Sequence, residues 1–215
     1  MSRVERLEYA HPSGWGFNTF CVRLPSGGLF VYSPSAGGLE GTGKLGTPEV
    51  LFCPNHVHHM ALEKYREKWP AALACASKAA LPRLGKQGHP GLRDAAEAPL
   101  PEGARLLVAE GINSGETILS LGDEWLVCDA FTNFGKPMTG PIGFGIGALG
   151  MKSGQVSVGR LFKWFSVKDA KAYRAWLFDA LDREQPKTVH FAHGEPLGGP
   201  AVVEKLKAAF EQRFT

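Results

Sequence analysis

The sequence predicts an α/β fold in which helices cover mixed β-sheets, and three observations support this class. Short apolar runs separated by turn residues dominate the first part and the middle of the chain, which is typical of β-hairpins. Elsewhere apolar runs alternate with segments of helical periodicity. The hydrophobic fraction of 44% and the charged fraction of 21% lie near globular averages, so a chain of 215 residues can bury a substantial core.

The predicted elements follow from local patterns. Residues 19–34 form a hairpin around a Pro-Ser-Gly-Gly turn. Further strands are predicted over residues 49–54, 71–77, 105–111, 116–121, 124–130 and 187–193. Helices are predicted over residues 61–69 and 78–84, from a capping box at Ser166 and Asp169 to Leu181, and from Pro200 onward. Residues 85–103 and the glycine-rich residues 131–160 are predicted loops.

Composition and charge narrow the function classes. Lys and Arg number 24 and Asp and Glu 21, a formal charge of +3 without a basic run, so neither a nucleic-acid partner nor an anionic membrane is indicated. No run of 18 apolar residues could span a bilayer, and the first ten residues lack the apolar run of a signal peptide. The four cysteines form no Cys-x-x-Cys pair, so we expect buried, reduced thiols in a cytoplasmic protein.

Histidine is the residue whose placement says most about function. Five of the seven histidines fall in two clusters, each beside the end of an apolar strand. The clusters are His56, His58 and His59 after residues 50–53, and His190 and His193 within residues 187–193. Asp129 ends a third strand in the same manner. Because ligands in sheet-based folds collect at the carboxyl ends of strands, these imidazoles and this carboxylate could converge on one metal such as Zn²⁺.

Each of these residues also has an ordinary structural explanation. Three histidines in four residues can form a polar surface loop, and His-x-His occurs often by chance. Asp129 can cap a turn, and His193 can hydrogen-bond the backbone beside Gly194. The residues alone leave both interpretations open.

At these positions the sequence resembles the metallo-β-lactamase-fold hydrolase superfamily. The motifs of that family occur in order: a His-x-His-x-Asp-His loop, a Gly-His turn, a strand ending in Asp and a last strand ending in His-Gly. They correspond here to NHVHHMA, GINSGE, LVCDA and FAHGEP. The resemblance spans the chain from Thr19 to the final helix. It implies a four-layer αββα sandwich, a single domain over residues 1–215, with a metal centre at one edge between two sheets.

The resemblance carries over four ligand positions and leaves three unmatched. His56 and His58 match the first two histidines of the loop motif. Asp129 matches the carboxylate that bridges two metals, and His193 matches the last ligand. Apolar residues occupy the remaining positions, namely Met60, Ala61 and Ile112. A two-metal site is therefore not expected, and the resemblance implies one divalent ion, Zn²⁺ or Fe²⁺, held by the four matching residues.

The implied activity is that of a divergent hydrolase. One metal would activate water for attack on a small ester, lactone or thioester-like substrate. Asp129 and His59 are the candidate catalytic residues, with His59 as a substitute ligand or base and Glu116 or Glu195 as a carboxylate partner. The alternative is a non-catalytic binding or scaffolding protein on the same fold, because three apolar residues at ligand positions are typical of a decayed, metal-free site. Substrate identity and oligomeric state are not predicted.

The glycine-rich residues 131–160 raise a separate question. Gly145, Gly147 and Gly150 spell the dinucleotide-binding pattern, but they follow no strand and open no clear helix, so a nucleotide cofactor is not expected. We interpret the segment as a flap near the site. Its aromatic and methionine side chains would face a substrate or pack the loop down; they are Phe131, Phe134, Met138 and Phe144.

Overall fold

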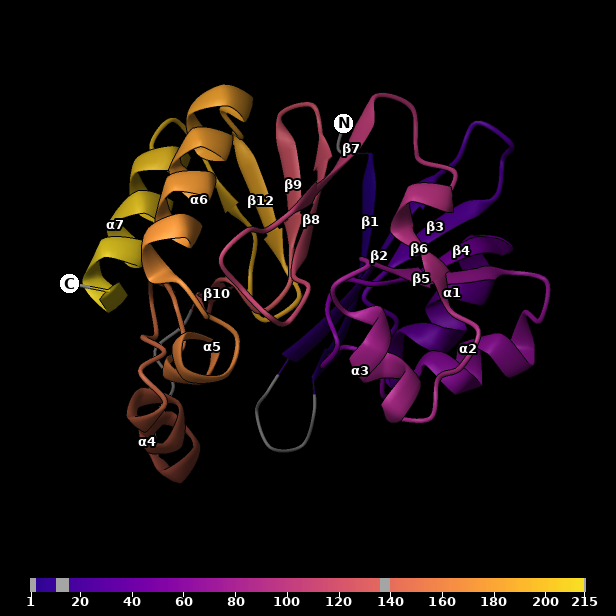
Figure 1. Cartoon of the computed structure of the whole chain (residues 1–215), viewed down its shortest axis with the longest axis horizontal. Coiled ribbons are helices and arrows are strands. Elements are labelled where there is room, and N and C mark those ends of the chain that lie inside the picture. The colour runs from indigo at the N-terminus through magenta and orange to yellow at the C-terminus, as the bar shows by residue number, and fades with distance from the viewer. Residues whose placement is uncertain (1–2, 11–15, 136–139, 215) are drawn as a thin grey trace.

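Two β-sheets pack face to face, and helices cover the outer face of each sheet (Figure 1). The computed structural model describes residues 3–10, 16–135 and 140–214. The four layers confirm the αββα sandwich that the sequence resemblance implies.

The first sheet contains six strands in the order β1-β2-β3-β4-β5-β6. They are β1 (Val4–Ala10), β2 (Gly16–Arg23), β3 (Leu29–Tyr32), β4 (Pro48–Cys53), β5 (Leu73–Ala76) and β6 (Arg93–Asp94). The predicted hairpin is confirmed as β2 and β3, with Phe20 opposite Tyr32. From β3 to β6 the strands run parallel. Sequence analysis missed β1, although its alternation buries Val4 and exposes Glu5 as an edge strand requires.

Short helices cover the outer face of the first sheet. They are α1 (Leu39–Leu45), α2 (Leu62–Lys68) and α3 (Leu81–Lys86), with single turns η1 (Ala36–Gly38) and η2 (Ala95–Glu97). Leu62, Tyr65 and Leu84 pack with Leu51 and Cys53 of β4 in one apolar cluster. This burial holds α2 directly after the histidine run.

The second sheet has the order β13-β12-β9-β8-β7. Its strands are β7 (Ala104–Val108), β8 (Thr117–Leu121), β9 (Glu124–Val127), β12 (Thr188–Phe191) and β13 (Leu197–Gly198). Its outer face is covered by α5 (Arg160–Phe165), α6 (Ala170–Glu184) and α7 (Val202–Phe214). The Asp169 side chain caps α6 by accepting hydrogen bonds from the backbone of residues 171 and 172.

Backbone bonds join the two sheets at the edge where the histidines lie. Asn18 N donates to Ala192 O at 2.8 Å, and Thr117 N donates to Pro54 O at 2.9 Å. The buried Tyr32 hydroxyl donates to Thr117 O at 2.8 Å. The loops after β3, β4, β9 and β12 are therefore held together at one end of the sandwich.

The glycine-rich segment differs from its prediction as a loop. It contains α4 (Gly140–Ala148) and the small pair β10 (Thr132–Asn133) and β11 (Val156–Ser157). Ile146 and Met151 are buried against Phe134, and this packing offsets the cost of about 1 kcal/mol that each helical glycine carries. Phe144 is exposed and Phe131 is buried, whereas Met138 lies outside the described residues.

Two further expectations can be compared with the structure. All four cysteines are buried and free of disulfide bonds. Among the described helices, none has the length and apolar character needed to cross a bilayer.

Candidate functional site

Loops after β4, β9 and β12 bring His58, Asp129 and His193 together. The two Nε2 atoms of His58 and His193 lie 3.0 Å apart. Asp129 Oδ1 lies 3.3 Å from His58 Nε2 and 3.2 Å from His193 Nε2. All three residues therefore present one donor atom each to a common point, although His58 and His193 are 135 positions apart in the sequence.

The outer nitrogens of both imidazoles are held by partners. His193 Nδ1 donates to Gly16 O at 3.2 Å, and since a carbonyl only accepts, the Nε2 of the neutral ring keeps its lone pair toward Asp129. His58 Nδ1 lies 2.9 Å from Ser33 Oγ. Ser33 follows β3 with a φ of 58°, a left-handed conformation that is costly for a residue other than glycine. The strained backbone aims the Ser33 hydroxyl at the imidazole.

The donor set fits a divalent transition metal. Ligand atoms at bond lengths of about 2.0–2.1 Å in tetrahedral geometry lie about 3.3–3.4 Å apart, close to the observed 3.0–3.3 Å. Three lone pairs at this separation repel one another unless a proton or a cation lies between them. Two imidazoles and one carboxylate suit Zn²⁺ and also Fe²⁺, and three protein ligands leave a position open.

Asn55, which sequence analysis did not single out, connects the cluster to the core. Its Nδ2 donates to Asp129 Oδ2 at 2.8 Å and to Glu116 Oε2 at 2.7 Å. Its Oδ1 accepts from the backbone N–H groups of Val57 at 2.8 Å and His58 at 3.0 Å. The side chain is fully buried and uses its whole hydrogen-bonding capacity, so it fixes the Asp129 carboxylate and the turn that carries His58.

Glu116 is a buried acid behind Asp129. Its Oε1 accepts from the backbone of Cys128 at 3.2 Å and Ala130 at 3.1 Å. Burial, and then the charge of Asp129, raise its pKa to about 8. Glu116 therefore holds a proton at neutral pH and does not compete with Asp129 for positive charge.

Asp129 has the opposite electrostatic behaviour. Burial raises its pKa. When a proton rather than a cation lies among the three donor atoms, the charge of His58 and the hydrogen bonds that protonated His193 and His58 donate outweigh this effect and hold the pKa of Asp129 well below its usual range. Asp129 is therefore the ionised member of the pair of carboxyl groups and carries the negative charge of the cluster.

Solved structures resemble this chain over nearly its whole length. The DIM-1 metallo-beta-lactamase matches with a TM-score of 0.59 and 11% identity, over 99% of this chain and 94% of that chain. The metallo-beta-lactamase from Pontibacter korlensis matches with a TM-score of 0.63 and 10% identity, over 97% and 94%. The one from Hirschia baltica gives a TM-score of 0.56 and 9% identity, over 97% and 98%.

The chain has the metallo-β-lactamase fold. No protein-family model and no curated protein sequence matches it. At these identities the similarity shows the fold alone.

His56 lies outside the cluster, unlike its predicted place among the ligands. The Arg83 guanidinium, which only donates, lies 3.0 Å from His56 Nε2, so that nitrogen accepts. His56 Nδ1 therefore carries the proton and donates to Ser114 O at 3.0 Å. Both ring nitrogens are engaged, and no lone pair faces Asp129. The cluster of His58, Asp129 and His193 thus contains three of the four residues that the sequence resemblance implies as ligands.

His59 forms a second hydrogen-bonded chain beside the cluster. Glu63 Oε1 accepts from His89 Nδ1 at 2.8 Å, so the Nε2 of a neutral His89 is an acceptor. His59 Nδ1 donates to that atom at 2.7 Å, which leaves the lone pair of His59 on Nε2. Burial, and then the charges of His89 and the neighbouring histidines, lower the pKa of His59, so the ring is neutral at pH 7. Sequence analysis missed His89, because it lies in a Pro- and Gly-rich loop without periodicity.

The other predicted positions lie apart from the cluster. Met60 is 75% exposed rather than packed into the cluster, and Ala61 is the residue before α2. Ile112 pairs with Val167 in an isolated β-bridge. Glu195 forms a surface ion pair of 2.9 Å with Arg6. The glycines of the dinucleotide-like pattern lie in and after α4 rather than after a strand, which does not suit a nucleotide.

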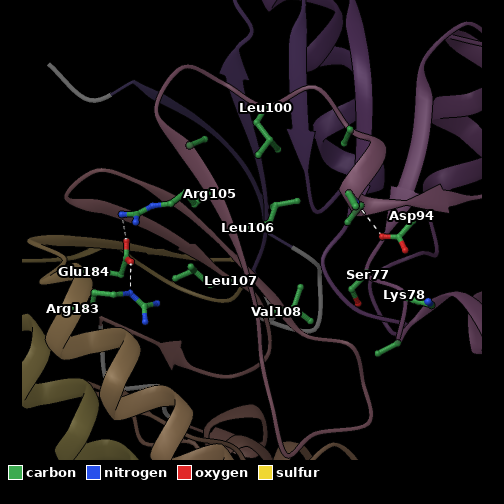
Figure 2. Close-up of a pocket in the computed structure, with 15 residues that line it drawn as sticks. Ser77, Lys78, Asp94, Leu100, Arg105, Leu106, Leu107, Val108, Arg183 and Glu184 are labelled. Carbon is green, nitrogen blue, oxygen red and sulfur yellow. Dashed lines mark hydrogen bonds and ion pairs between the residues drawn. The ribbon is translucent and has the colours of Figure 1, made fainter.

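Two cavities adjoin the cluster. One has a volume of about 580 Å³, and the other about 310 Å³; both are lined by Val57, Asp129 and His193. Figure 2 shows a more voluminous groove of about 970 Å³ elsewhere, along β7, where Arg105 and Arg183 pair with Glu184. Its described lining residues include no histidine or cysteine, so they offer no nitrogen or sulfur donor set like that of the His58–Asp129–His193 cluster.

Proposed function

We propose that this chain is a metal-dependent hydrolase of a small ester, lactone or thioester-like compound. One Zn²⁺ or Fe²⁺ ion would be held by His58, Asp129 and His193. The observation that carries the proposal is the convergence of these three donor atoms within 3.0–3.3 Å, each with its outer side fixed by a hydrogen bond. A divalent ion held there would supply Lewis-acid activation of water near neutral pH.

Around that ion, the residues of the chain have separate tasks. Asp129 supplies the negative charge, and Asn55 keeps one of its oxygens turned away from the imidazoles. His59 is the proposed proton acceptor, because Glu63 and His89 orient its ring and a lowered pKa keeps it neutral. The cavity of about 580 Å³ that His59 lines lies in the range of small-molecule sites.

The alternative, a metal-free binding protein, would have apolar side chains in place of the ligands. Met60 is exposed, and Ile112 forms an isolated β-bridge with Val167, so neither fills the space among His58, Asp129 and His193. The hydrolase is therefore the better-supported proposal. We further propose that residues 1–215 form one domain, and that the four free buried cysteines belong to a protein of the cytoplasm.

Metal content tests the proposal. We would purify the chain without chelator and measure metal by elemental analysis in the wild type, His58→Gln and His56→Gln. About one equivalent in the wild type and in His56→Gln, and none in His58→Gln, is the expected result. Loss of metal in His56→Gln alone would reject the assigned ligands. No metal in any form, even after incubation with Zn²⁺, would support the binding protein.

Activity is tested separately. The metal-loaded protein should hydrolyse at least one compound in a panel of aryl esters, lactones and thioesters, and Asp129→Asn should reduce the rate by at least about a hundredfold. Equal rates for Asp129→Asn and wild type would show that the hydrolysis does not use this site.

A further inference from the structure

The His58–Asp129–His193 cluster lies between two cavities. The larger, which we call the Tyr9 compartment, has about 580 Å³ and includes Tyr9, Phe17, Pro34, Ala36 and Met60 among its lining residues. The smaller, the Phe162 compartment, has about 310 Å³ and includes Met151, Gly159, Leu161, Phe162 and Phe165. Because both share Val57, Asp129 and His193, a ligand whose centre contacts the cluster can extend in two directions.

Both compartments are mainly apolar. In the Phe162 compartment the only charged or titratable side chains among the described lining residues are Asp129 and His193. In the Tyr9 compartment the charged or titratable side chains among the described lining residues, besides the histidines and Asp129, are Tyr9 and Lys64, and Lys64 is exposed on α2. Apart from the exposed Lys64, the described walls outside the cluster offer a charged substituent no partner for the hydration that it loses, so they favour apolar groups.

Apolar side chains also surround the openings. Met60 is 75% exposed, Phe165 69%, Val57 46% and Leu161 42%, and all four line one compartment or both. Large apolar side chains that remain exposed around a cavity are typical of a surface that an apolar ligand covers. The polar atoms lie at the centre of the site and the apolar surface lies on either side of it.

We propose that the substrate is an open-chain ester or thioester with an apolar group on each side of the scissile carbonyl, one in each compartment. The inference rests on the proposed function for the position of the carbonyl at Asp129 and His193. It narrows the substrate class, because a compact lactone or a compound charged on both sides would leave one compartment empty or bury a charge.

Three unreactive ketones test the two compartments without turnover. 2-Octanone has methyl and hexyl arms. 5-Undecanone adds three CH₂ groups to the short arm, and 2-undecanone adds the same three to the long arm. Affinities are measured by calorimetry. Each fully buried CH₂ raises affinity about fourfold, so the three added CH₂ groups should make 5-undecanone bind roughly tenfold to sixtyfold more tightly than 2-octanone, depending on how completely they are buried.

Gly159→Leu separates the compartments. The φ of Gly159 is −69°, and a Cβ there would meet Met151 at an ordinary 3.5 Å, so a side chain fits without backbone strain and fills the Phe162 compartment. In Gly159→Leu the higher affinity of 5-undecanone relative to 2-octanone should disappear. The affinity of 2-undecanone relative to 2-octanone should change less than twofold. Ala36→Leu, in the Tyr9 compartment, should have the reverse effect. Leu161→Asp at the rim provides a second variant should Gly159→Leu fail to fold.

Equal affinity of 5-undecanone and 2-octanone for the wild type, or a gain that survives Gly159→Leu, would overturn the inference. The measurements are made on both metal-free and Zn²⁺-loaded protein. A two-arm preference in a protein that binds no metal would reject the hydrolase but retain the apolar ligand. Metal binding and ester hydrolysis without a preference for 5-undecanone would support the hydrolase and reject the substrate with two apolar arms.

Discussion

Replacing Asn55 by aspartate changes one NH₂ group into an oxygen and leaves the shape of the side chain almost unchanged. The Oδ1 bonds to the backbone of Val57 and His58 persist. The two donated bonds, to Asp129 at 2.8 Å and to Glu116 at 2.7 Å, are lost. A hydrogen bond to a charged acceptor contributes about 1.5–3 kcal/mol and one to a neutral acceptor about 1 kcal/mol. The expected loss in unfolding free energy is therefore about 3 kcal/mol.

The loss of unfolding free energy caused by Asn55→Asp should depend on pH. The new carboxyl group lies beside two others in a fully buried position, and both burial and like charge raise its pKa. At pH 5.5 it holds a proton and regains one of the two donors, so about half of the loss, roughly 1.5 kcal/mol, should return. At pH 8.5 the full loss of about 3 kcal/mol should be observed.

Urea unfolding of the metal-free protein at both pH values measures this difference. With a slope of about 2 kcal/mol per molar urea, the midpoint should fall by about 1.5 M at pH 8.5 and by about half as much at pH 5.5. Asn55→Leu is the control, because it loses the same donors and can gain no proton, so its cost relative to wild type should stay nearly constant. An Asn55→Asp cost that is equal at the two pH values, or below about 0.5 kcal/mol, would refute the bridging role.

Three further predictions concern neighbouring residues. Glu116, with its pKa raised to about 8, stays protonated in the folded state while it ionises in the unfolded state, so the unfolding free energy should fall as pH rises from about 4.5 to 8. Urea unfolding should show that Glu116→Gln removes most of this pH dependence. Ser33→Ala should weaken Zn²⁺ binding about 10- to 100-fold in a chelator competition, and unchanged affinity would exclude the hydroxyl as support for His58. Gly194 has a φ of +111°, and a Cβ there would lie 2.1 Å from Asn133 O, so Gly194→Ala should lower the unfolding free energy by at least about 3 kcal/mol in thermal unfolding. The control Gly122→Ala should cost about 1 kcal/mol, because a Cβ at that position meets nothing within 4 Å.

The fold was largely predictable because its signals are local. The Pro-Ser-Gly-Gly turn and the flanking apolar runs predict β2 and β3, and the apolar runs over residues 116–121 and 124–130 predict the neighbouring strands β8 and β9. The helix α4 could not be predicted, since its glycines disfavour helix and only the burial of Ile146 and Met151 against Phe134 compensates.

The candidate site was predictable only in part. Strand ends predict that His58, Asp129 and His193 approach one another, but they also favour His56 equally. The guanidinium of Arg83, 27 residues after His56, donates a hydrogen bond to His56 Nε2. No periodic pattern relates the two positions, so the sequence does not show that His56 is engaged elsewhere. The tasks of Asn55 depend on carboxyl groups 61 and 74 positions away, so that distance in sequence hides them.

The three converging donors belong to different halves of the sandwich. His58 follows a strand of the first sheet, and Asp129 and His193 follow strands of the second. The stretch from Pro99 to Glu102, in which Pro99 and Glu102 themselves are exposed, joins the halves. A chain cut there would yield two fragments, neither of which carries the full set of donors. The donor set would then assemble only when the two fragments associate. An ion that binds at the cluster would therefore stabilise the complex of the fragments, and the association constant would rise with the affinity of the ion.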